Sequence, residues 1–290
     1  MIANLEALAA LADEGTVGRA ATRLRLTQSA VSKRIAALEN ELDKRLVERH
    51  GRRLRLTPAG VRLLEKTGPL VTALRQAALE ESAPAGGRIV LGVSESLLTS
   101  WAPALLQRVR RSLPDLDLVL NAHRSPVALE RVRAGEYMLA LCAGVAADLP
   151  DLKVFPLGQE PMVVVPSGLK KLPREKGGTL RVITIEANAA TWGCLEAPLR
   201  RARQQWGFAV EVQSTLQSFS CIAQLARNGH GHGLVPLGVA RALGLSERRL
   251  FRLPGLARPV GLAGRATVMA SPLVEGFCAA LRENMGEGWE

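Results

Sequence analysis

The spacing of apolar residues changes character near residue 87. In residues 1–81 apolar positions recur every three or four residues, which is the period of amphipathic helices. Beyond residue 87, short apolar runs such as 88–93, 116–120 and 138–142 alternate with helical stretches. Alternation of this kind is typical of parallel sheets covered by helices on both faces. The pattern therefore predicts a helical N-terminal domain followed by an α/β domain.

The helical pattern of residues 1–50 predicts several helices, of which the third begins after Thr27. Thr27 is suited to cap the first turn of this helix. Four apolar residues at helical spacing form one face: Val31, Ile35, Leu38 and Leu42. The opposite face carries small, hydrogen-bonding and basic residues: Ser29, Ser32, Lys33 and Ala36. An apolar back with such a front suits a helix that lies in the major groove of DNA. The alternative is an ordinary solvated helix face.

Two further elements are expected before the change in pattern. In residues 49–56, basic and apolar side chains alternate after the turn at Gly51, which predicts a small basic hairpin, or wing. Thr57 and Pro58 then begin a helix that we expect to run to about Glu81, roughly 35 Å at 1.5 Å per residue. Because 87 residues alone cannot bury so long a helix, we expect it to pair with a second copy of the chain.

Charge supports a polyanionic partner but does not locate it. The formal net charge is +11, which favours nucleic acid first and an anionic membrane second. The excess is spread over both parts of the chain, so charge alone decides little. No apolar run reaches the length that spans a bilayer, and we find no signal peptide. We therefore expect a cytoplasmic protein without a membrane partner, whose four scattered cysteines are reduced.

Residues 13–60 carry many fixed positions of one family's DNA-binding region. These are Gly15, Ala20, Ala21, Leu24, the run 27–32 (Thr-Gln-Ser-Ala-Val-Ser), Ile35, Leu38, Glu39, Leu42, Leu46, Arg49 and the run 56–60 (Leu-Thr-Pro-Ala-Gly). The segment resembles LysR-type transcriptional regulators. Two positions depart from that pattern: Asp43 stands where the family usually has glycine, and Val47 where it usually has an aromatic residue.

The resemblance implies a fold and a division of the chain. The fold class is α/β with an N-terminal all-α winged helix-turn-helix and a C-terminal, two-lobed, periplasmic-binding-protein-like α/β effector domain. The expected parts are the DNA-binding domain 1–57, a dimerising linker helix 58–81, a hinge 82–87 and the effector domain 88–290. Within the effector domain we expect lobe I at 88–160 and about 265–290, and lobe II at 161–264.

The resemblance also implies DNA contacts and partners. On the recognition helix we expect Thr27, Gln28, Ser29, Ser32, Lys33 and Arg34 to face DNA, and in the wing Arg52, Arg53 and Arg55. Hydroxyl and amide groups can read base edges, whereas arginines of a wing meet phosphates or the minor groove. The expected partners are double-stranded DNA, RNA polymerase and further copies of the chain, as a dimer and a homotetramer.

Four loops are expected to line an effector site between the lobes. In an open α/β sheet, ligands bind at the carboxyl ends of strands and near helix N-termini. The residues placed there are Ser94, Glu95, Ser96, Ser125, Thr191, Trp192, Ser218 and Phe219. Hydroxyls and backbone N–H groups favour a carboxylate, and Glu95 could hold an ammonium group; the segment 96–101 resembles regulators that sense basic amino acids. Alternatively, Ser94 and Ser96 merely cap a helix.

Other functions find less support in the sequence. His230 and His232 with Cys221 suggest a metal site, but histidines flanking a glycine in a turn are more often incidental, so we expect no metal and no cofactor besides the effector. Cys194 and Cys221 could form a redox pair. No nucleophile elbow, P-loop or HExxH motif is present, so we expect no enzyme. The remaining alternatives are an α/β binding protein or enzyme whose N-terminal helices only dimerise, and a regulator without an effector.

Overall fold

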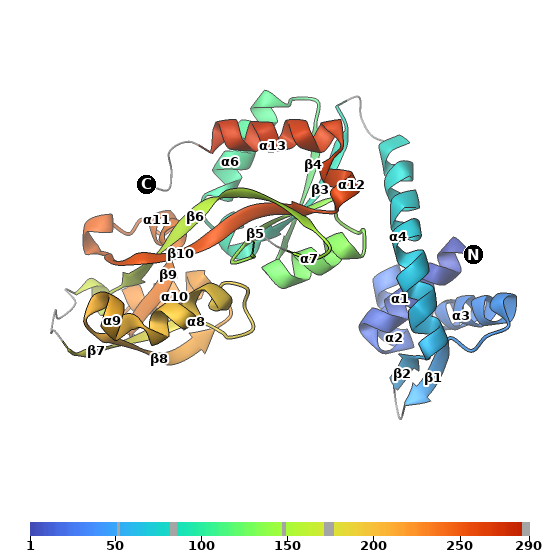
Figure 1. The fold of residues 1–290 in the computed structure, drawn as a ribbon, viewed down its shortest axis with the longest axis horizontal. Helices are drawn as coiled ribbons and strands as arrows, with labels where there is room; N and C mark the ends of the chain where they lie inside the picture. Colours follow the sequence, from blue (N-terminus) through green and yellow to red (C-terminus); the bar gives the residue numbers. More distant parts are fainter. Residues whose placement is uncertain (51–52, 82–85, 147–148, 171–176, 286–290) are drawn as a thin grey trace. The chain divides into compact units, whose positions relative to one another are not determined.

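The structure is a computed structural model that describes residues 1–50, 53–81, 86–146, 149–170 and 177–285. The chain divides into two compact units, Met1–Ser82 and Ala83–Glu290. Each unit is described by itself (Figure 1). The hinge expected at 82–87 lies largely outside the described residues.

Three helices build the core of the N-terminal unit: α1 (Ile2–Glu14), α2 (Val17–Leu24) and α3 (Gln28–Leu42). Gly15 ends α1 in the left-handed conformation with φ 69°, and the Thr16 hydroxyl caps α2 by accepting from the Arg19 N–H at 3.4 Å. The buried face of α1 consists of Leu5, Ala7, Leu8, Ala10 and Leu11.

The wing and the long helix form where the sequence predicts them. Strands β1 (Val47–His50) and β2 (Arg53–Leu56) pair antiparallel, and α4 (Pro58–Glu81) follows. The Thr57 hydroxyl accepts the Gly60 N–H at 3.2 Å at the start of α4. Among the described side chains of α4, those of Val61, Leu70 and Leu74 are apolar and exposed. Exposed apolar residues on a helix are typical of interaction surfaces.

The departure at Asp43 from the family's glycine has a simple structural reading. Asp43 ends α3 in the left-handed conformation, with φ 47° and ψ 46°. Glycine adopts this region without strain, and aspartate is one of the few other residues that tolerate it. The second departure, Val47, packs half-buried against the core of the N-terminal unit. Both residues therefore fit the turn that follows the recognition helix.

The C-terminal unit contains one eight-stranded sheet in the order β4-β3-β5-β10-β6-β9-β7-β8. Its strands are β3 (Arg88–Ser94), β4 (Asp117–His123), β5 (Leu139–Ala143), β6 (Lys153–Val165), β7 (Thr179–Ile185), β8 (Ala209–Leu216), β9 (His232–Pro236) and β10 (Phe251–Gly264). The sheet is mixed, unlike the parallel sheets that the sequence predicted. Strands within each outer trio are parallel, but β10 runs antiparallel to β5 and β6, and β6 antiparallel to β9.

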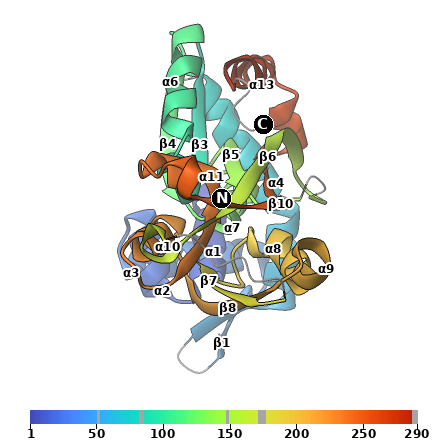
Figure 2. The ribbon, with the colours of Figure 1, turned by 90° about the vertical axis from the view of Figure 1, so that its left-hand side faces the viewer.

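The helices of this unit lie on both faces of the two parallel trios. They are α5 (Glu95–Leu98), α6 (Ala102–Ser112), α7 (Ser125–Arg133), α8 (Trp192–Arg200), α9 (Ala202–Trp206), α10 (Phe219–Arg227), α11 (Leu237–Ala242), α12 (Ala266–Met269) and α13 (Pro272–Asn284). Figure 2 shows α10 on one side of β7 and β8, and α8 with α9 on the other. Pro103 lies in the first turn of α6, where a helix needs no N–H from that residue.

The two larger hydrophobic cores among the described residues of the C-terminal unit mark its lobes. One core contains residues of β3, β5, α6 and α13, and the other contains residues of β6, β7, β9 and α10. Strand β10 contributes Leu256 to the second core and Val260 to the first. The strand therefore changes cores between these two residues, whereas the sequence placed that change at about residue 265. The crossing strands β6 and β10 lie side by side at the junction of the lobes (Figure 1).

Candidate functional site

The recognition helix presents the two faces that its sequence predicts. Val31, Ile35 and Leu38 are buried in the core of the N-terminal unit. Five of the α3 residues expected to face DNA are exposed: Thr27, Gln28, Ser29, Ser32 and Lys33. The sixth, Arg34, is half-buried. The Thr27 hydroxyl accepts the Ala30 N–H at 3.2 Å, so its first role is to cap α3. The exposed face is free to lie against a nucleic acid groove.

The wing is tied to the recognition helix by a residue whose role the sequence did not reveal. The Glu39 carboxylate accepts two backbone N–H groups, from Leu46 at 2.7 Å and Val47 at 3.1 Å. These bonds connect the last turn of α3 to the start of β1. Among the wing arginines, Arg55 is exposed; Arg52 lies outside the described residues, as does the side chain of Arg53.

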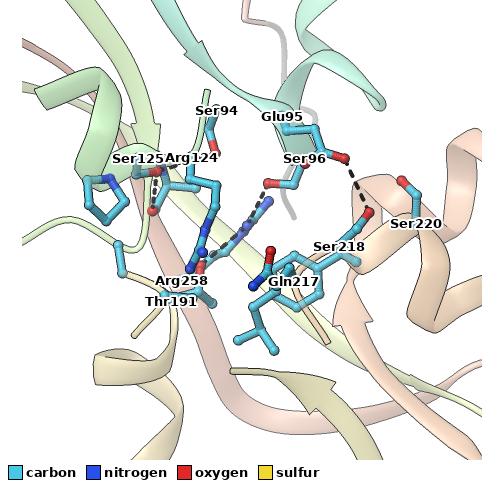
Figure 3. Close-up of a pocket in the computed structure, with 16 residues that line it drawn as sticks. Ser94, Glu95, Ser96, Arg124, Ser125, Thr191, Gln217, Ser218, Ser220 and Arg258 are labelled. Atoms are coloured by element: carbon cyan, nitrogen blue, oxygen red, sulfur yellow. Dashed lines mark hydrogen bonds between the residues drawn. The ribbon is translucent and has the colours of Figure 1, made fainter. Parts of the chain in front are cut away.

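A pocket opens between the two lobes at the carboxyl ends of the strands (Figure 3). Its cavity volume is about 40 Å³, well below the roughly 300 Å³ or more of a typical small-ligand site. It brings together seven of the expected effector residues: Ser94, Glu95, Ser96, Ser125, Thr191, Ser218 and Phe219. The expectation that Trp192 lines the effector site is wrong, because this residue does not line the pocket. As the first residue of α8 it is half-buried against the core of lobe II.

Ser94 and Ser96 do not act as helix caps. Ser94 precedes α5, but its side chain makes no cap hydrogen bond. Its hydroxyl lies 3.3 Å from that of Ser125, which in turn bonds the backbone of Ala143 at the end of β5. Ser96 lies within α5, and its hydroxyl accepts from Arg258 at 3.0 Å. The capping alternative is therefore wrong for both serines.

The floor of the pocket holds a buried ion pair that the sequence did not indicate. Arg258 on β10 and Glu160 on β6 are opposite each other in the sheet, and both are fully buried. The Arg258 Nε and Nη2 atoms donate to Glu160 Oε2 at 2.8 and 2.6 Å. Removing one partner of such a pair typically costs about 3–5 kcal/mol, because the other charge is left buried and unpaired. The only sequence signal was the presence of charged residues within otherwise apolar runs.

Several polar contacts join the two lobes around the mouth of the pocket. Arg124, from the loop before α7, lies 2.5 Å from the Glu186 carboxylate and donates to the Asn188 side chain at 2.9 Å. Opposite this pair, the Ser218 hydroxyl donates to the Glu95 carboxylate at 3.2 Å. One partner of each contact belongs to lobe I and the other to lobe II. The two lobes are therefore in contact at the mouth of the pocket.

The alternative chemistries find no supporting geometry in the described residues. The His232 Nδ1 atom accepts the Ser167 N–H at 3.0 Å, and burial lowers the pKa of its imidazole. No group of three His, Cys, Asp or Glu side chains suited to a metal occurs among the residues that the structure describes.

Cys194 and Cys221 are both free thiols, and burial raises the pKa of Cys194. A raised pKa opposes formation of the thiolate that peroxide chemistry requires. No described helix is long and apolar enough to cross a membrane.

Comparisons with known proteins agree with this architecture. Residues 2–61 match the bacterial regulatory helix-turn-helix proteins of the lysR family, and residues 82–286 match the LysR substrate binding domain. A Vibrio cholerae protein described as an uncharacterized HTH-type transcriptional regulator is 28% identical over 289 residues, covering 98% of this chain and 96% of its own. A Streptomyces viridosporus protein described as a probable hydrogen peroxide-inducible genes activator is 29% identical, covering 98% of this chain and 94% of its own.

Solved structures share the fold at low sequence identity. A full-length OxyR variant from Pseudomonas aeruginosa matches with a TM-score of 0.64 at 19% identity, covering 97% of both chains. Full-length CbnR in complex with its target DNA matches with a TM-score of 0.64 at 17% identity, covering 98% of this chain and 99% of its own. With both domains matched in order along the chain, this protein belongs to the LysR family: it is a transcriptional regulator with a helix-turn-helix DNA-binding domain and an effector-binding domain.

Proposed function

We propose that the effector of this regulator is a small molecule carrying a carboxylate and a cationic group, such as an amino acid. The observation that supports this is the distribution of charge in the pocket. The two arginines that line it, Arg258 and Arg124, are already paired with Glu160 and Glu186. The Glu95 side chain is exposed at the mouth of the pocket, and its carboxylate accepts a hydrogen bond from the Ser218 hydroxyl. An ammonium group is the natural partner for this carboxylate.

The other end of the pocket suits the carboxylate of the same molecule. Ser96 and Thr191 present hydroxyls there, beside Arg258. Hydroxyl groups that donate hydrogen bonds stabilise negative charge. A molecule with opposite charges at its two ends therefore matches both ends of the pocket.

The DNA-binding mode follows from the N-terminal unit. The exposed face of α3 reads the major groove, and the wing arginines contact the sugar–phosphate backbone. The exposed residues Val61, Leu70 and Leu74 of α4 pair with a second chain, so that two recognition helices meet an inverted repeat. Dimers associate into a tetramer that acts on RNA polymerase in the cytoplasm, where the DNA is.

Effector binding changes how the assembly holds its DNA. A ligand that contacts both lobes favours the arrangement in which they are closed, and thereby shifts the packing of dimers within the tetramer. The altered packing changes the bend of the DNA between the half-sites. The ligand acts only to the extent that it binds one arrangement more tightly than the other.

The effector class is tested by binding to the full chain. The twenty amino acids and a set of short organic acids are screened by thermal unfolding, and compounds that raise the melting temperature are titrated by calorimetry. We expect a binder that carries both charges and loses affinity when either its carboxylate or its amine is removed. Binding only of neutral or purely cationic compounds, or no binding at all, would contradict the proposal.

A further inference from the structure

From the contacts around Arg258, we infer that this residue fixes the hydroxyls of Ser96 and Thr191 as hydrogen-bond donors to the ligand, so that the pocket selects a carboxylate and the ligand joins the two lobes. The inference deepens the proposed function and rests on it. Arg258 is thus a positioning residue, which acts on the ligand through two hydroxyl groups.

The guanidinium of Arg258 is held in a fixed orientation. Two of its nitrogens donate to Glu160 Oε2, and its central carbon lies 5.3 Å from the centre of the Phe219 ring. The second oxygen of Glu160 accepts from the Trp101 indole at 3.3 Å and from the Gly238 N–H at 3.2 Å. A methyl group on Gly238 would come within 2.5 Å of that oxygen, so the site depends on glycine there. The carboxylate therefore cannot swing away, and neither can its arginine.

The third nitrogen of Arg258 points toward the pocket. Nη1 donates to the Ser96 hydroxyl at 3.0 Å and to the Thr191 hydroxyl at 3.4 Å, as Figure 3 shows. Arginine carries no acceptor, so each hydroxyl oxygen must accept in these contacts. A hydroxyl that accepts from a cation has its own proton left to donate elsewhere. Among the hydrogen bonds of the described residues, neither hydroxyl has a protein acceptor for that proton.

Both hydroxyls line the pocket, and they come from different lobes. Ser96 lies in α5 of lobe I, and Thr191 immediately precedes α8 of lobe II. A ligand carboxylate can accept a hydrogen bond from both hydroxyls at once. A ligand group that can only donate would face two donors and leave both hydroxyl protons without an acceptor. A ligand carboxylate thus bridges the lobes through hydroxyls that Arg258 has oriented. This explains how one small molecule could favour the closed arrangement.

The test compares the wild-type full chain with a double variant, Glu160→Gln with Arg258→Met. This pair removes the guanidinium without leaving an unpaired buried charge, and glutamine can still accept from Trp101 and Gly238. Single variants Ser96→Ala and Thr191→Val remove one hydroxyl each, and Ser112→Ala, on the exposed end of α6, is the matched serine control. Circular dichroism and thermal unfolding establish that each variant is folded.

The readout is a ratio of affinities rather than an affinity. Each amino or organic acid that binds the wild type is titrated alongside its own carboxamide, which replaces one acceptor oxygen by a donor. We expect the wild type and Ser112→Ala to prefer the acid by about tenfold or more. The double variant should lose most of this preference, because its hydroxyls can turn either way, and each single hydroxyl variant should lose part of it. A merely structural role for Arg258 would lower both affinities and keep their ratio.

The possible failures are distinguishable. If acids bind the wild type and the double variant keeps the full preference over carboxamides, the role of Arg258 is wrong and the proposed effector class stands. If the wild type binds acid and carboxamide equally, the inference is wrong while the pocket remains a ligand site. If no compound of the panel binds the wild type, both the effector class and the inference drawn from it are wrong.

Discussion

A β-carbon added to Gly144 would lie 2.4 Å from the backbone nitrogen of Thr191 and 2.5 Å from its α-carbon, closer than β-carbons come to other atoms in real structures. Gly144 directly follows β5 in lobe I, and Thr191 directly precedes α8 in lobe II. The glycine also has φ +75°, a conformation that other residues rarely adopt. The closeness of the lobes beside the pocket therefore depends on the absence of one side chain.

Replacing Gly144 by alanine should push the loop before α8 away from lobe I. The Thr191 hydroxyl would then move out of reach of Arg258, and we expect effector affinity to fall by about tenfold or more. The left-handed conformation adds a cost of about 1–2 kcal/mol to the free energy of unfolding. Calorimetric titration and urea unfolding measure the two effects. Gly193→Ala is the control, since nothing lies within 4 Å of its β-carbon; equal affinities in the two variants would show that lobe closeness does not matter.

Replacing Lys33 by alanine should weaken operator binding. Lys33 is exposed on the face of α3 opposite the buried residues, where it can meet a phosphate or a guanine. If it meets a phosphate, the slope of log affinity against log salt should fall by about one unit, with a similar loss on all sequences. Gel shifts over a salt series measure both quantities, with exposed Lys153→Ala in the C-terminal unit as the charge-matched control. Unchanged affinity at moderate salt would remove Lys33 from the DNA contacts.

Replacing Glu95 by glutamine should change which ligands bind rather than whether they bind. The carboxylate is exposed, so its pairing with an ammonium group is worth only about two- to fivefold in affinity. We expect that loss for an amino acid and none for the corresponding acid without the amine. Titration of both compounds against this variant and against Glu130→Gln, an exposed change on α7, gives the comparison. An equal loss for both compounds would show that Glu95 does not read the amine.

The cysteines should differ widely in reactivity. Burial raises the pKa of Cys142 to about 12 and that of Cys278 to about 11, so both remain thiols at pH 8. Burial also raises the pKa of Cys194, whereas Cys221 is exposed. We expect iodoacetamide to label Cys221 first in the folded protein, with the buried thiols gaining reactivity only as the pH rises toward their pKa. Mass spectrometry of tryptic peptides measures the order; rapid labelling of Cys194 would revive the redox alternative.

Local signals predicted the N-terminal unit well. The caps at Thr16, Thr27 and Thr57 and the stop at Gly15 each act over four residues or fewer, so they can be read from short segments. Seven of the eight proposed effector residues line one pocket because the ends of parallel strands meet at the same edge of a sheet. The prediction for Trp192 was wrong because a side chain next to the edge of the sheet can instead point into the core of its lobe.

Long-range pairing was beyond local reading. Arg258 and Glu160 are 98 residues apart, and only the antiparallel register of β10 with β6 places them together. The period of apolar residues does not distinguish an antiparallel strand from a parallel one, because side chains alternate between the two faces in both. The lobe junction and the floor of the pocket therefore had to come from the structure.

The central claim is that a ligand between the lobes controls how this regulator holds its DNA. The most direct measurement is a DNase I footprint of the full chain on the DNA upstream of its own gene, with and without each compound of the amino acid and organic acid panel. We predict protection of an imperfect inverted repeat, with a footprint or a hypersensitive bend that changes with a compound that binds the pocket. A footprint that every such compound leaves unchanged, or no sequence-specific protection at all, would contradict the account.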